Sequence, residues 1–445
     1  MTTRFRLPLI AAAIALSAAP VAAQLLPGTV GRVVGGIDRT VGNVTAPVFG
    51  QSGGDAPGAQ RALVGGAFDR VSTLASSVAA SSDSLLDLRR LRLSLLVDAH
   101  RAELARDGDG NVVRRDRLVA VEPDTASLAA AARAGFHVIG GVSAPELGMR
   151  LVTLAIPPRM NPRKALDRLR QVAPAVDADF DHVFEPAGGA LSPSSALLAA
   201  GAAGLAPAGT RIAMVDGGVA SHPSMARASI EQKGFAGAAS ATGHGTAIAS
   251  LLVGDEGAFR GAARGASLFV ADVYGGNPAA GSASTIVRAL GWAASKNPRL
   301  INISLVGPPN RAIERAVAGL RARGIMVVAA VGNDGPAAPP QYPASYDGVV
   351  AVTGVDAKGK ALVEAGRARH LDFAAPGAEL AAALPGKGYA SVRGTSFAAP
   401  LAAARLAATG SPDRLAAEAR PGKGKVGRGI VCGECRVAPK AVGAR

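Results

Sequence analysis

The chain has 445 residues, of which 49% are hydrophobic, so it is long and apolar enough for about three domains with buried cores. This composition excludes a disordered or fibrous protein. Lysine and arginine number 48 against 33 aspartates and glutamates, a net charge of +15, but the basic residues are spread along the chain. Only 4% of the residues are aromatic. Without a basic stripe or stacking residues, we expect no nucleic-acid partner.

Residues 1–23 have the layout of a signal peptide. Arg4 and Arg6 precede an apolar run at 7–16, and small residues lead up to Ala23, after which we expect cleavage. The alternative, a retained membrane anchor, fits less well because the run falls short of about 20 residues. No later stretch reaches membrane-span length without Gly, Pro or charge. We therefore predict a secreted or periplasmic protein with no membrane span once the signal is removed.

The region that follows begins with a segment of low complexity. Residues 24–83 are rich in Gly, Ala, Ser and Val without a sustained period, which is typical of a linker. Leucines at helical spacing then predict one amphipathic helix over 84–106. Residues 107–111, Asp-Gly-Asp-Gly-Asn, end it with a turn. A calcium loop is the alternative, but Val112 and Leu118 stand where Gly and Glu are needed.

A small α+β domain is predicted over residues 84–187. Its strands and helices alternate as β-α-β-β-α-β, the order of a ferredoxin-like domain. The expected elements are strand 118–121, helix 127–134, strand 136–139, strand 150–156, helix 162–172 and strand 179–184. Residues 188–209, mostly Ala, Gly, Pro and Ser, read as an exposed connection between domains, with a short helix possible at 195–205.

From residue 210 to 431 the pattern changes to apolar strands alternating with amphipathic helices. Near-continuous apolar strands are buried on both faces, which predicts an α/β fold with a mainly parallel sheet covered by helices on both faces. The expected strands are 211–215, 267–273, 300–305, 325–331 and 349–355, and helices are expected around 286–294 and 311–321. In such a sheet the ligand crevice lies beyond the carboxyl ends of the strands.

Four polar residues stand where that crevice should be. Asp216 follows an apolar strand, and His244 stands between glycines at the start of a predicted helix. Ser396 opens the apolar helix 397–408, and Asn333 follows the strand 325–331. A serine hydroxyl becomes nucleophilic when a histidine takes its proton and a carboxylate orients that histidine. Taken alone, such an Asp is more often a turn former, such a His a solvated or capping residue, and such a Ser an N-cap, but their coincidence predicts a catalytic set.

At this point the sequence resembles the subtilisin-like serine proteases, or subtilases. The resemblance rests on three motifs in the family's order, within residues 210–431: Asp-Gly-Gly-Val at 216–219, His-Gly-Thr at 244–246 and Gly-Thr-Ser-Phe-Ala-Ala-Pro at 394–400. It implies a serine endopeptidase with polypeptide substrates. Asp216, His244 and Ser396 would be its catalytic residues, as orienting partner, general base and nucleophile. Asn333 would be the side-chain donor of its oxyanion hole.

A fourth segment resembles the family's substrate-binding strand, whose residues here are Ser304, Leu305, Val306 and Gly307. The alternative is an ordinary strand end that runs into a turn. The chain departs from the family at Gly217, where Ser or Thr is usual, and at Ala247, where a second His is usual. Val306 in place of Gly, and Val331 in place of a smaller residue, are expected to narrow the primary specificity pocket.

The resemblance also gives the small domain a role, since secreted subtilases are commonly zymogens with a ferredoxin-like propeptide that blocks the cleft. Residues 84–187 would then be the propeptide, an intramolecular inhibitor, and maturation would cut between about 186 and 209 in the connection 188–209. The alternative is a permanent accessory domain. We expect no cofactor and no metal, with calcium as an alternative that the sequence does not support, because no loop carries enough carboxylates for the calcium sites of many relatives.

Cys432 and Cys435, in the C-terminal tail 432–445, predict a local disulfide rather than a redox motif or half of a zinc site. A catalytically inactive, peptide-binding pseudoprotease of the same fold remains the alternative function. A nucleotide-binding protein would need a Gly-rich turn after the first strand, and an α/β-hydrolase a Gly-x-Ser-x-Gly elbow, and neither is present.

Overall fold

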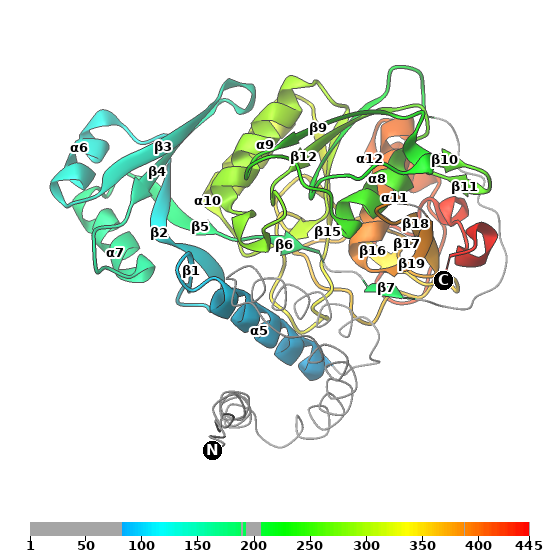
Figure 1. The fold of residues 1–445 in the computed structure, drawn as a ribbon, viewed down its shortest axis with the longest axis horizontal. Coiled ribbons are helices and arrows are strands. Elements are labelled where there is room, and N and C mark those ends of the chain that lie inside the picture. The colour runs from blue at the N-terminus through cyan, green and yellow to red at the C-terminus, as the bar shows by residue number, and fades with distance from the viewer. Residues whose placement is uncertain (1–81, 188–189, 193–205, 387, 445) are drawn as a thin grey trace, which may run out of the picture. The chain divides into compact units, whose positions relative to one another are not determined.

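The structure, a computed structural model, describes residues 82–187, 190–192, 206–386 and 388–444 (Figure 1). The predicted signal peptide, nearly all of the predicted linker and the possible helix at 195–205 lie outside these residues. Within them, we find no helix with the length and apolar character needed to cross a membrane.

A parallel sheet of seven strands organises residues 206–444, which we call the large domain. Its strand order is β17-β16-β15-β13-β8-β12-β9, and every neighbouring pair is parallel. The strands are β8 (Arg211–Asp216), β9 (Ser229–Gly234), β12 (Ser267–Asp272), β13 (Leu300–Ile303), β15 (Met326–Ala330), β16 (Val349–Val355) and β17 (Phe373–Pro376). The five predicted strands are confirmed within one or two residues, whereas β9 and β17 were not predicted.

Helices cover both faces of this sheet, as the apolar strands predicted. They are α8 (Gly243–Val253), α9 (Ala283–Ser295), α10 (Arg311–Ala322), α11 (Thr395–Thr409) and the short α12 (Pro412–Ala417). Successive residues of β8 point to opposite faces. Ile212 and Met214 join the hydrophobic cluster of α8 and α11, while Ala213 and Val215 join that of α9 and α10. Figure 1 shows the two helix pairs on opposite sides of the sheet.

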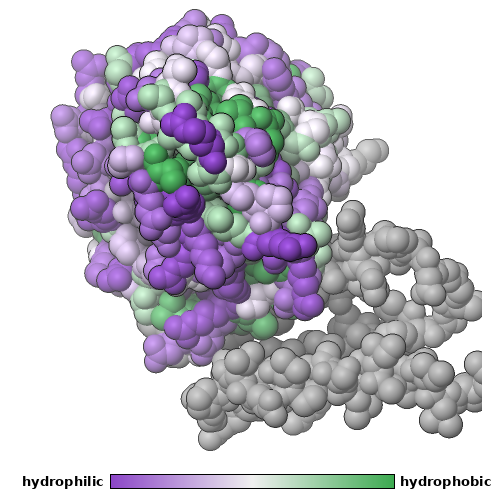
Figure 2. Space-filling model, turned by 90° about the vertical axis from the view of Figure 1, so that its left-hand side faces the viewer, coloured by the Kyte–Doolittle hydropathy of each residue, from purple (hydrophilic) through white to green (hydrophobic). Residues whose placement is uncertain are grey.

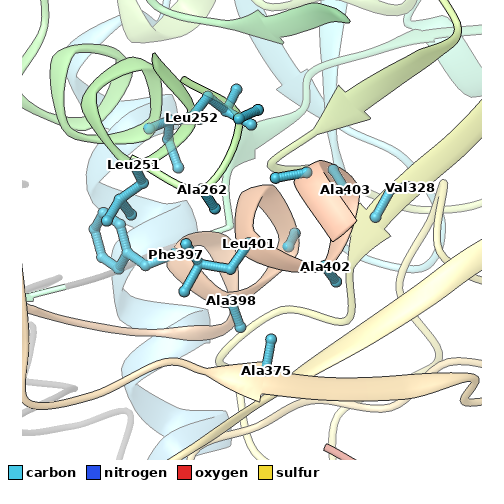
Figure 3. Close-up of a cluster of buried hydrophobic side chains, with 14 of the residues drawn as sticks. Leu251, Leu252, Ala262, Val328, Ala375, Phe397, Ala398, Leu401, Ala402 and Ala403 are labelled. Carbon is cyan, nitrogen blue, oxygen red and sulfur yellow. The ribbon is translucent and has the colours of Figure 1, made fainter. Parts of the chain in front are cut away.

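Helix α11 is buried around nearly its whole circumference. Figure 3 shows Phe397, Ala398 and Leu401 of this helix between Leu251 of α8 and Ala375 of β17. Its many alanines let α8 and the sheet approach closely, and a helix that is apolar on all sides is stable only inside a core. The first turn of α11 is therefore held rigidly against the carboxyl ends of the strands.

A second sheet lies in residues 104–187, which we call the small domain. Its elements are β1 (Leu104–Arg106), β2 (Val112–Val121), α6 (Thr125–Arg133), β3 (His137–Ala144), β4 (Met149–Ala155), α7 (Pro162–Val172) and β5 (Asp177–His182). Strand β2 pairs with β4 on one side and β5 on the other, and β3 pairs with β4, all antiparallel. The order β5-β2-β4-β3 is that of the predicted ferredoxin-like β-α-β-β-α-β unit.

The predicted helix over 84–106 is wrong at its C-terminal end. Helix α5 runs over Ser82–Ala99, and the chain then turns into strand β1. The leucine periodicity continues formally to Leu104, but that residue pairs with Arg114 in the sheet and is fully buried. The ladder with β2 and the burial of Leu104 outweigh the helical pattern.

The segment 107–111 forms the predicted turn. One oxygen of the Asp107 carboxylate accepts the backbone N–H groups of Asp109 (2.9 Å) and Asn111 (2.8 Å), and the other accepts the Asn111 side-chain amide (2.9 Å). These bonds link β1 to β2 and use the carboxylate as a turn-forming group.

The small-domain sheet is covered on both faces by different partners. Leu118 and Leu154 face a cluster with residues of α6 and α7. Val119 and Leu151 face the opposite way, into the cluster that contains α9 and α10 of the large domain. The side of the molecule that carries this domain is mainly hydrophilic, with hydrophobic areas between the polar ones (Figure 2).

Short antiparallel strands complete the fold. They are β6 (Glu185–Pro186) with β14 (Leu305–Val306), β7 (Ala190–Ser192) with β19 (Tyr389–Arg393), β18 (Leu380–Ala383) with β19, and β10 (Asp255–Glu256) with β11 (Phe259–Arg260). Cys432 and Cys435 form a disulfide, which confirms the predicted local bond.

Candidate active site

Asp216 is the last residue of β8 and is completely buried. Its Oδ1 accepts the backbone N–H of Gly217 at 2.7 Å. Glycine is required there because a Cβ on Gly217 would overlap the side chain of Thr242. Thr242 is the N-cap of α8, and its hydroxyl accepts the Gly245 N–H at 2.9 Å. The departure at Gly217 thus makes room for the residue that starts the next helix.

His244 lies in the first turn of α8 and faces the Asp216 carboxylate. Its Nδ1 is 2.9 Å from one oxygen of that carboxylate and 3.0 Å from the other. Its Nε2 is buried and has no hydrogen-bond partner among the residues that the structure describes. A carboxylate at Nδ1 favours the tautomer with the proton on that nitrogen, which leaves Nε2 with a lone pair.

Ser396 lies in the first turn of α11 and is completely buried. Gly394, whose φ of 146° suits glycine, brings the chain from β19 into this helix. The backbone oxygen of Ser396 accepts the Ser304 hydroxyl at 3.0 Å. The ring of its neighbour Phe397 lies 5.4 Å from the ring of His244, measured between centroids. The starts of α8 and α11 therefore meet at the carboxyl edge of the sheet.

Asn333 follows β15 and has its side-chain amide fixed at both ends. Its Oδ1 accepts the backbone N–H of Thr395 at 2.9 Å, and the Thr395 hydroxyl donates to Gly332 O at 3.1 Å. Its Nδ2 donates to the backbone oxygen of Ala187. The side-chain N–H group thus points at a peptide carbonyl beside the start of α11.

Ser304, Leu305, Val306 and Gly307 form an extended segment and not a plain turn. Strand β14 pairs antiparallel with β6, with Leu305 opposite Pro186 and Val306 opposite Glu185. The oxygen of Ser304 accepts the Ala187 N–H at 2.8 Å. The segment that was predicted to bind an extended peptide is paired with an extended piece of this chain.

The other departures lie in the core. Ala247 is completely buried in α8, and its methyl group offers neither a hydrogen-bond donor nor an acceptor. Val331 is buried, and a Cγ of Val306 lies 3.3 Å from the position that a Cβ on Gly332 would take. Val306 and Ala187 belong to the same hydrophobic cluster. The expected narrow specificity pocket stays a prediction.

The structure thus gathers the predicted residues at one edge of the sheet, after strands β8, β13 and β15 and at the starts of α8 and α11. Sequence reasoning missed Thr242, which caps the helix that carries His244, and Thr395, which positions the Asn333 side-chain amide. It also missed residues 184–187, which lie along β14. Their register had no signal in the sequence because a two-residue strand that contains proline shows no periodicity.

Comparison with known proteins agrees with this arrangement. Residues 208–414 match the model of the subtilase family. Over 203 residues the chain is 34% identical to subtilisin Savinase of Lederbergia lenta, covering 44% of this chain and 74% of that protein. An alkaline protease of Shouchella clausii is also 34% identical over 203 residues, and these cover 53% of its length. The chain thus spans about half of that relative.

A solved structure extends the likeness beyond the matched segment. Fervidolysin from Fervidobacterium pennivorans, a keratinolytic enzyme related to subtilisin, matches with a TM-score of 0.62 at 18% identity, over 75% of this chain and 62% of that one. At this identity the likeness concerns the fold alone.

Fold, site residues and relatives together define a subtilisin-like serine protease. The chain belongs to the subtilase family.

Proposed function

We propose that the protein is an exported serine endopeptidase that cuts peptide bonds through an acyl-enzyme on Ser396. The observation that carries the proposal is the pair formed by His244 and Asp216. The Asp216 carboxylate holds Nδ1, and the opposite ring nitrogen is buried without a partner among the described residues. An imidazole oriented in this way accepts a proton from an alcohol and stays stabilised as a cation.

In this reaction Ser396 Oγ attacks the carbonyl carbon of the substrate, and its proton passes to His244 Nε2. The negative charge that develops on the carbonyl oxygen is bound by the Asn333 amide and by the Ser396 backbone N–H at the N-terminus of α11. The carbon–nitrogen bond then breaks, and the leaving amine takes the proton from His244. Water hydrolyses the acyl ester by the same route in reverse.

The same proposal includes export and synthesis as a zymogen. Export is supported by the signal-peptide layout of residues 1–23. Zymogen synthesis is supported by the strand β6, which runs along β14 at the site, and by the sheet face of the small domain that packs on α9 and α10. A segment in that position competes with any polypeptide substrate, so residues 84–187 act as an intramolecular inhibitor.

Labelling with a fluorophosphonate probe tests the proposed chemistry. The full chain is incubated until its mass is stable, and probe attachment and hydrolysis of casein are then measured. We expect one probe on Ser396 and casein cleavage, and neither with Ser396→Ala, which lacks the nucleophile. A folded chain that is freed of its N-terminal region yet takes up no probe and cuts no casein is a pseudoprotease, and the proposal is then wrong.

A further inference from the structure

Residues 183–187 lie in the site as an extended strand between two segments of the large domain. On one side, β6 pairs with β14. On the other, Val183 forms an antiparallel bridge with Ser282, and the Phe184 N–H donates to Gly281 O at 2.8 Å. Backbone bonds on both edges fix the register of this segment, which we call the tail.

The register puts one particular peptide carbonyl at the proposed oxyanion donor. Ala187 donates its N–H to Ser304 O, and its own oxygen accepts the Asn333 side-chain amide. Ser304 in turn binds the backbone of Ser396 through its hydroxyl. Ala187 is thus held by Asn333 and Ser304, two residues that also contact the first turn of α11. If the tail were shifted by one residue, the carbonyl group nearest Asn333 would point away from it, because successive residues of an extended strand alternate in direction.

The chain continues on the other side of the nucleophile. Strand β7 pairs antiparallel with β19, with Ala190 opposite Arg393. Strand β19 leads directly into Gly394 and α11. Both sides of the bond that follows Ala187 are therefore held by backbone pairing, as a bound substrate is before cleavage.

Side chains of the tail fill sites in the large domain. Phe184 is completely buried, and a Cβ on Gly307 would overlap its ring. The Tyr274 hydroxyl donates to Phe184 O at 3.1 Å. Ala187 is buried in the cluster that contains Val306, where a larger side chain would need space. The site thus takes an aromatic residue three positions before a small one.

We infer that the bond between Ala187 and Gly188 is cut when this protein matures, and that the tail is the template for its substrates. These are extended polypeptides with a small residue before the cleaved bond and an aromatic residue three positions earlier. The inference rests on the proposed function. Ser396 Oγ forms an ester with the Ala187 carbonyl, the bond to Gly188 breaks, and the amine of Gly188 leaves with the proton from His244. Water then releases Ala187 as a carboxylate.

N-terminal sequencing and intact mass of the mature chain test the bond. We expect the mature protein to begin at Gly188 and Ser396→Ala to stay uncut there. Ala187→Trp should slow the cut by more than about tenfold, since its indole exceeds the site. A labelled, active chain that begins elsewhere would overturn this inference and leave the proposed function standing. A folded chain that is neither cut nor labelled, nor active on casein once freed, would remove both.

Peptide anilides test the template on the mature protein. Phe-Glu-Pro-Ala-anilide should be cut with a kcat/KM at least about tenfold above Ala-Glu-Pro-Ala-anilide and Phe-Glu-Pro-Trp-anilide. The matched control is Phe-Gln-Pro-Ala-anilide, which should stay within about twofold, because the Glu185 carboxylate is bound by Arg92 of α5, which the mature protein lacks. Equal rates for all four peptides would contradict the template.

Helix α5 carries a second, independent inference. Arg89 pairs with Asp334 at 3.1 Å, and Arg92 pairs with Asp334 at 3.0 Å and with Glu185 at 3.2 Å. All four side chains are at most 16% exposed. Asp334 follows the oxyanion residue Asn333 directly in the chain. Arg92 alone therefore ties α5 to both the tail and the oxyanion segment.

The surroundings of these arginines make the contact strong. Burial alone lowers the pKa of Arg92, but the carboxylates of Asp334 and Glu185 outweigh it, so the pKa is raised. Leu85 adds an apolar contact, since a Cβ on Gly335 would overlap it. Burial shields such pairs from water and salt, and losing one of them mainly raises the dissociation rate.

We propose that Arg89 and Arg92 form a latch that keeps the severed N-terminal part on the site after the cut. The latch sets the delay between cutting and activity. Cut product on a gel and peptide hydrolysis are followed together in the full chain. Arg92→Gln should shorten the delay by more than about tenfold, and Arg89→Gln, which removes one ion pair, by less.

Arg90→Gln is the matched control, because Arg90 lies on the same helix and its side chain is 73% exposed. Its delay should equal that of the parent. All three substitutions lie before residue 188, so the mature chains of the variants are identical in sequence and must have the same specific activity. Circular dichroism of the same variants combined with Ser396→Ala, which stay uncut, checks that they fold. If Arg92→Gln does not fold, the delay of Arg89→Gln tests the latch instead. A delay in both Arg89→Gln and Arg92→Gln that matches Arg90→Gln would overturn the latch.

Discussion

The two sheets of this protein are buried in different ways. The sheet of the large domain has α8 and α11 on one face and α9 and α10 on the other, all from the same domain. The sheet of the small domain has its own helices on one face only, and the large domain covers the second. The sheet of the large domain is therefore covered by its own helices on both faces, whereas the sheet of the small domain reaches its full burial only while attached.

This difference fits the proposed role of the small domain, which is needed only until the chain is cut. Apolar surface that a partner covers contributes to attachment as well as to folding, since both states are linked by mass action. Under the proposed maturation the small domain leaves, the residues that faced α9 and α10 are then exposed, and its folded state loses that contribution.

Two leucines of β4 separate the faces. Leu154 faces α6 and α7, Leu151 faces α9 and α10, and both are completely or almost completely buried. In the uncut Ser396→Ala precursor, Leu154→Ala and Leu151→Ala should each cost about 2 to 5 kcal/mol of unfolding free energy, because each leaves a cavity.

Hydrogen exchange shows which face each variant loosens. Leu154→Ala should speed exchange of the amides in α7, while Leu151→Ala should speed exchange mainly in α10, where the small domain docks. Equal exchange in α7 for the two variants would show that the faces do not behave separately.

A glycine of α10 offers a change with opposite effects on the two states. A Cβ on Gly319 would overlap the backbone oxygen of Leu147, so Gly319→Ala interferes with docking of the small domain. In the mature chain the same change should stabilise α10 by up to about 1 kcal/mol, because alanine is the better helix former. We expect the severed small domain to be retained more than about tenfold less tightly, since tenfold corresponds to only about 1.4 kcal/mol.

Size-exclusion chromatography after cutting measures that retention, and urea unfolding of the mature chain measures the stabilisation. Gly291→Ala is the control, because the nearest atom to its new Cβ, in Ala144, is 3.3 Å away, so this change needs only a small shift where Gly319→Ala meets a backbone oxygen directly. If Gly319→Ala retains the severed small domain as tightly as the parent does, the contact at Leu147 does not hold the domains together.

The sequence predicted those parts of the fold whose signals are local. The five central strands are apolar runs, and Asp216, His244 and Ser396 each stand in a short motif on a rigid element. Strand β9 was missed because it lies at the edge of the sheet, where most of its side chains are exposed and polar. Strand β17 was missed because Phe-Ala-Ala-Pro is too short to show a period.

Contacts between distant segments could not be predicted. The charges of α5 look like the solvated side of an amphipathic helix, yet Arg92 meets a carboxylate 242 positions further along the chain. The pairing of β6 with β14 likewise depends on how the small domain docks. Neither contact has a local pattern, because each is fixed by the packing of whole elements.

Two buried carboxylates of the small domain give the smallest and sharpest test, because their pKa values move in opposite directions. Burial favours the neutral acid in both. In Asp107, hydrogen bonds from His182 and Asn111 outweigh burial, and the pKa is lowered from 3.8. In Asp181, which accepts the Ser284 N–H and hydroxyl at the start of α9, burial prevails and the pKa is raised from 3.8.

The signs of the pH effects follow from these two directions. A lowered pKa means that Asp107 stabilises the precursor above its usual value of 3.8 and that this is lost as pH falls through the lowered pKa. A raised pKa means that the contribution of Asp181 is fully present below 3.8 and is lost as pH rises through the raised pKa. Asp107→Asn should therefore cost most at neutral pH, by about 1 to 3 kcal/mol.

Asp181→Asn should behave in the reverse sense, since a neutral amide keeps the contacts with Ser284 without burying a charge. Relative to the parent, its unfolding free energy should improve by about 1 kcal/mol or more as pH rises from about 4 to about 7. Urea unfolding of the uncut Ser396→Ala precursor at several pH values measures both variants. If the unfolding free energies of the two variants, relative to the parent, changed with pH in the same direction, the Asp181 carboxylate would be stabilised as an anion. Attachment of the small domain would then strengthen as pH rises.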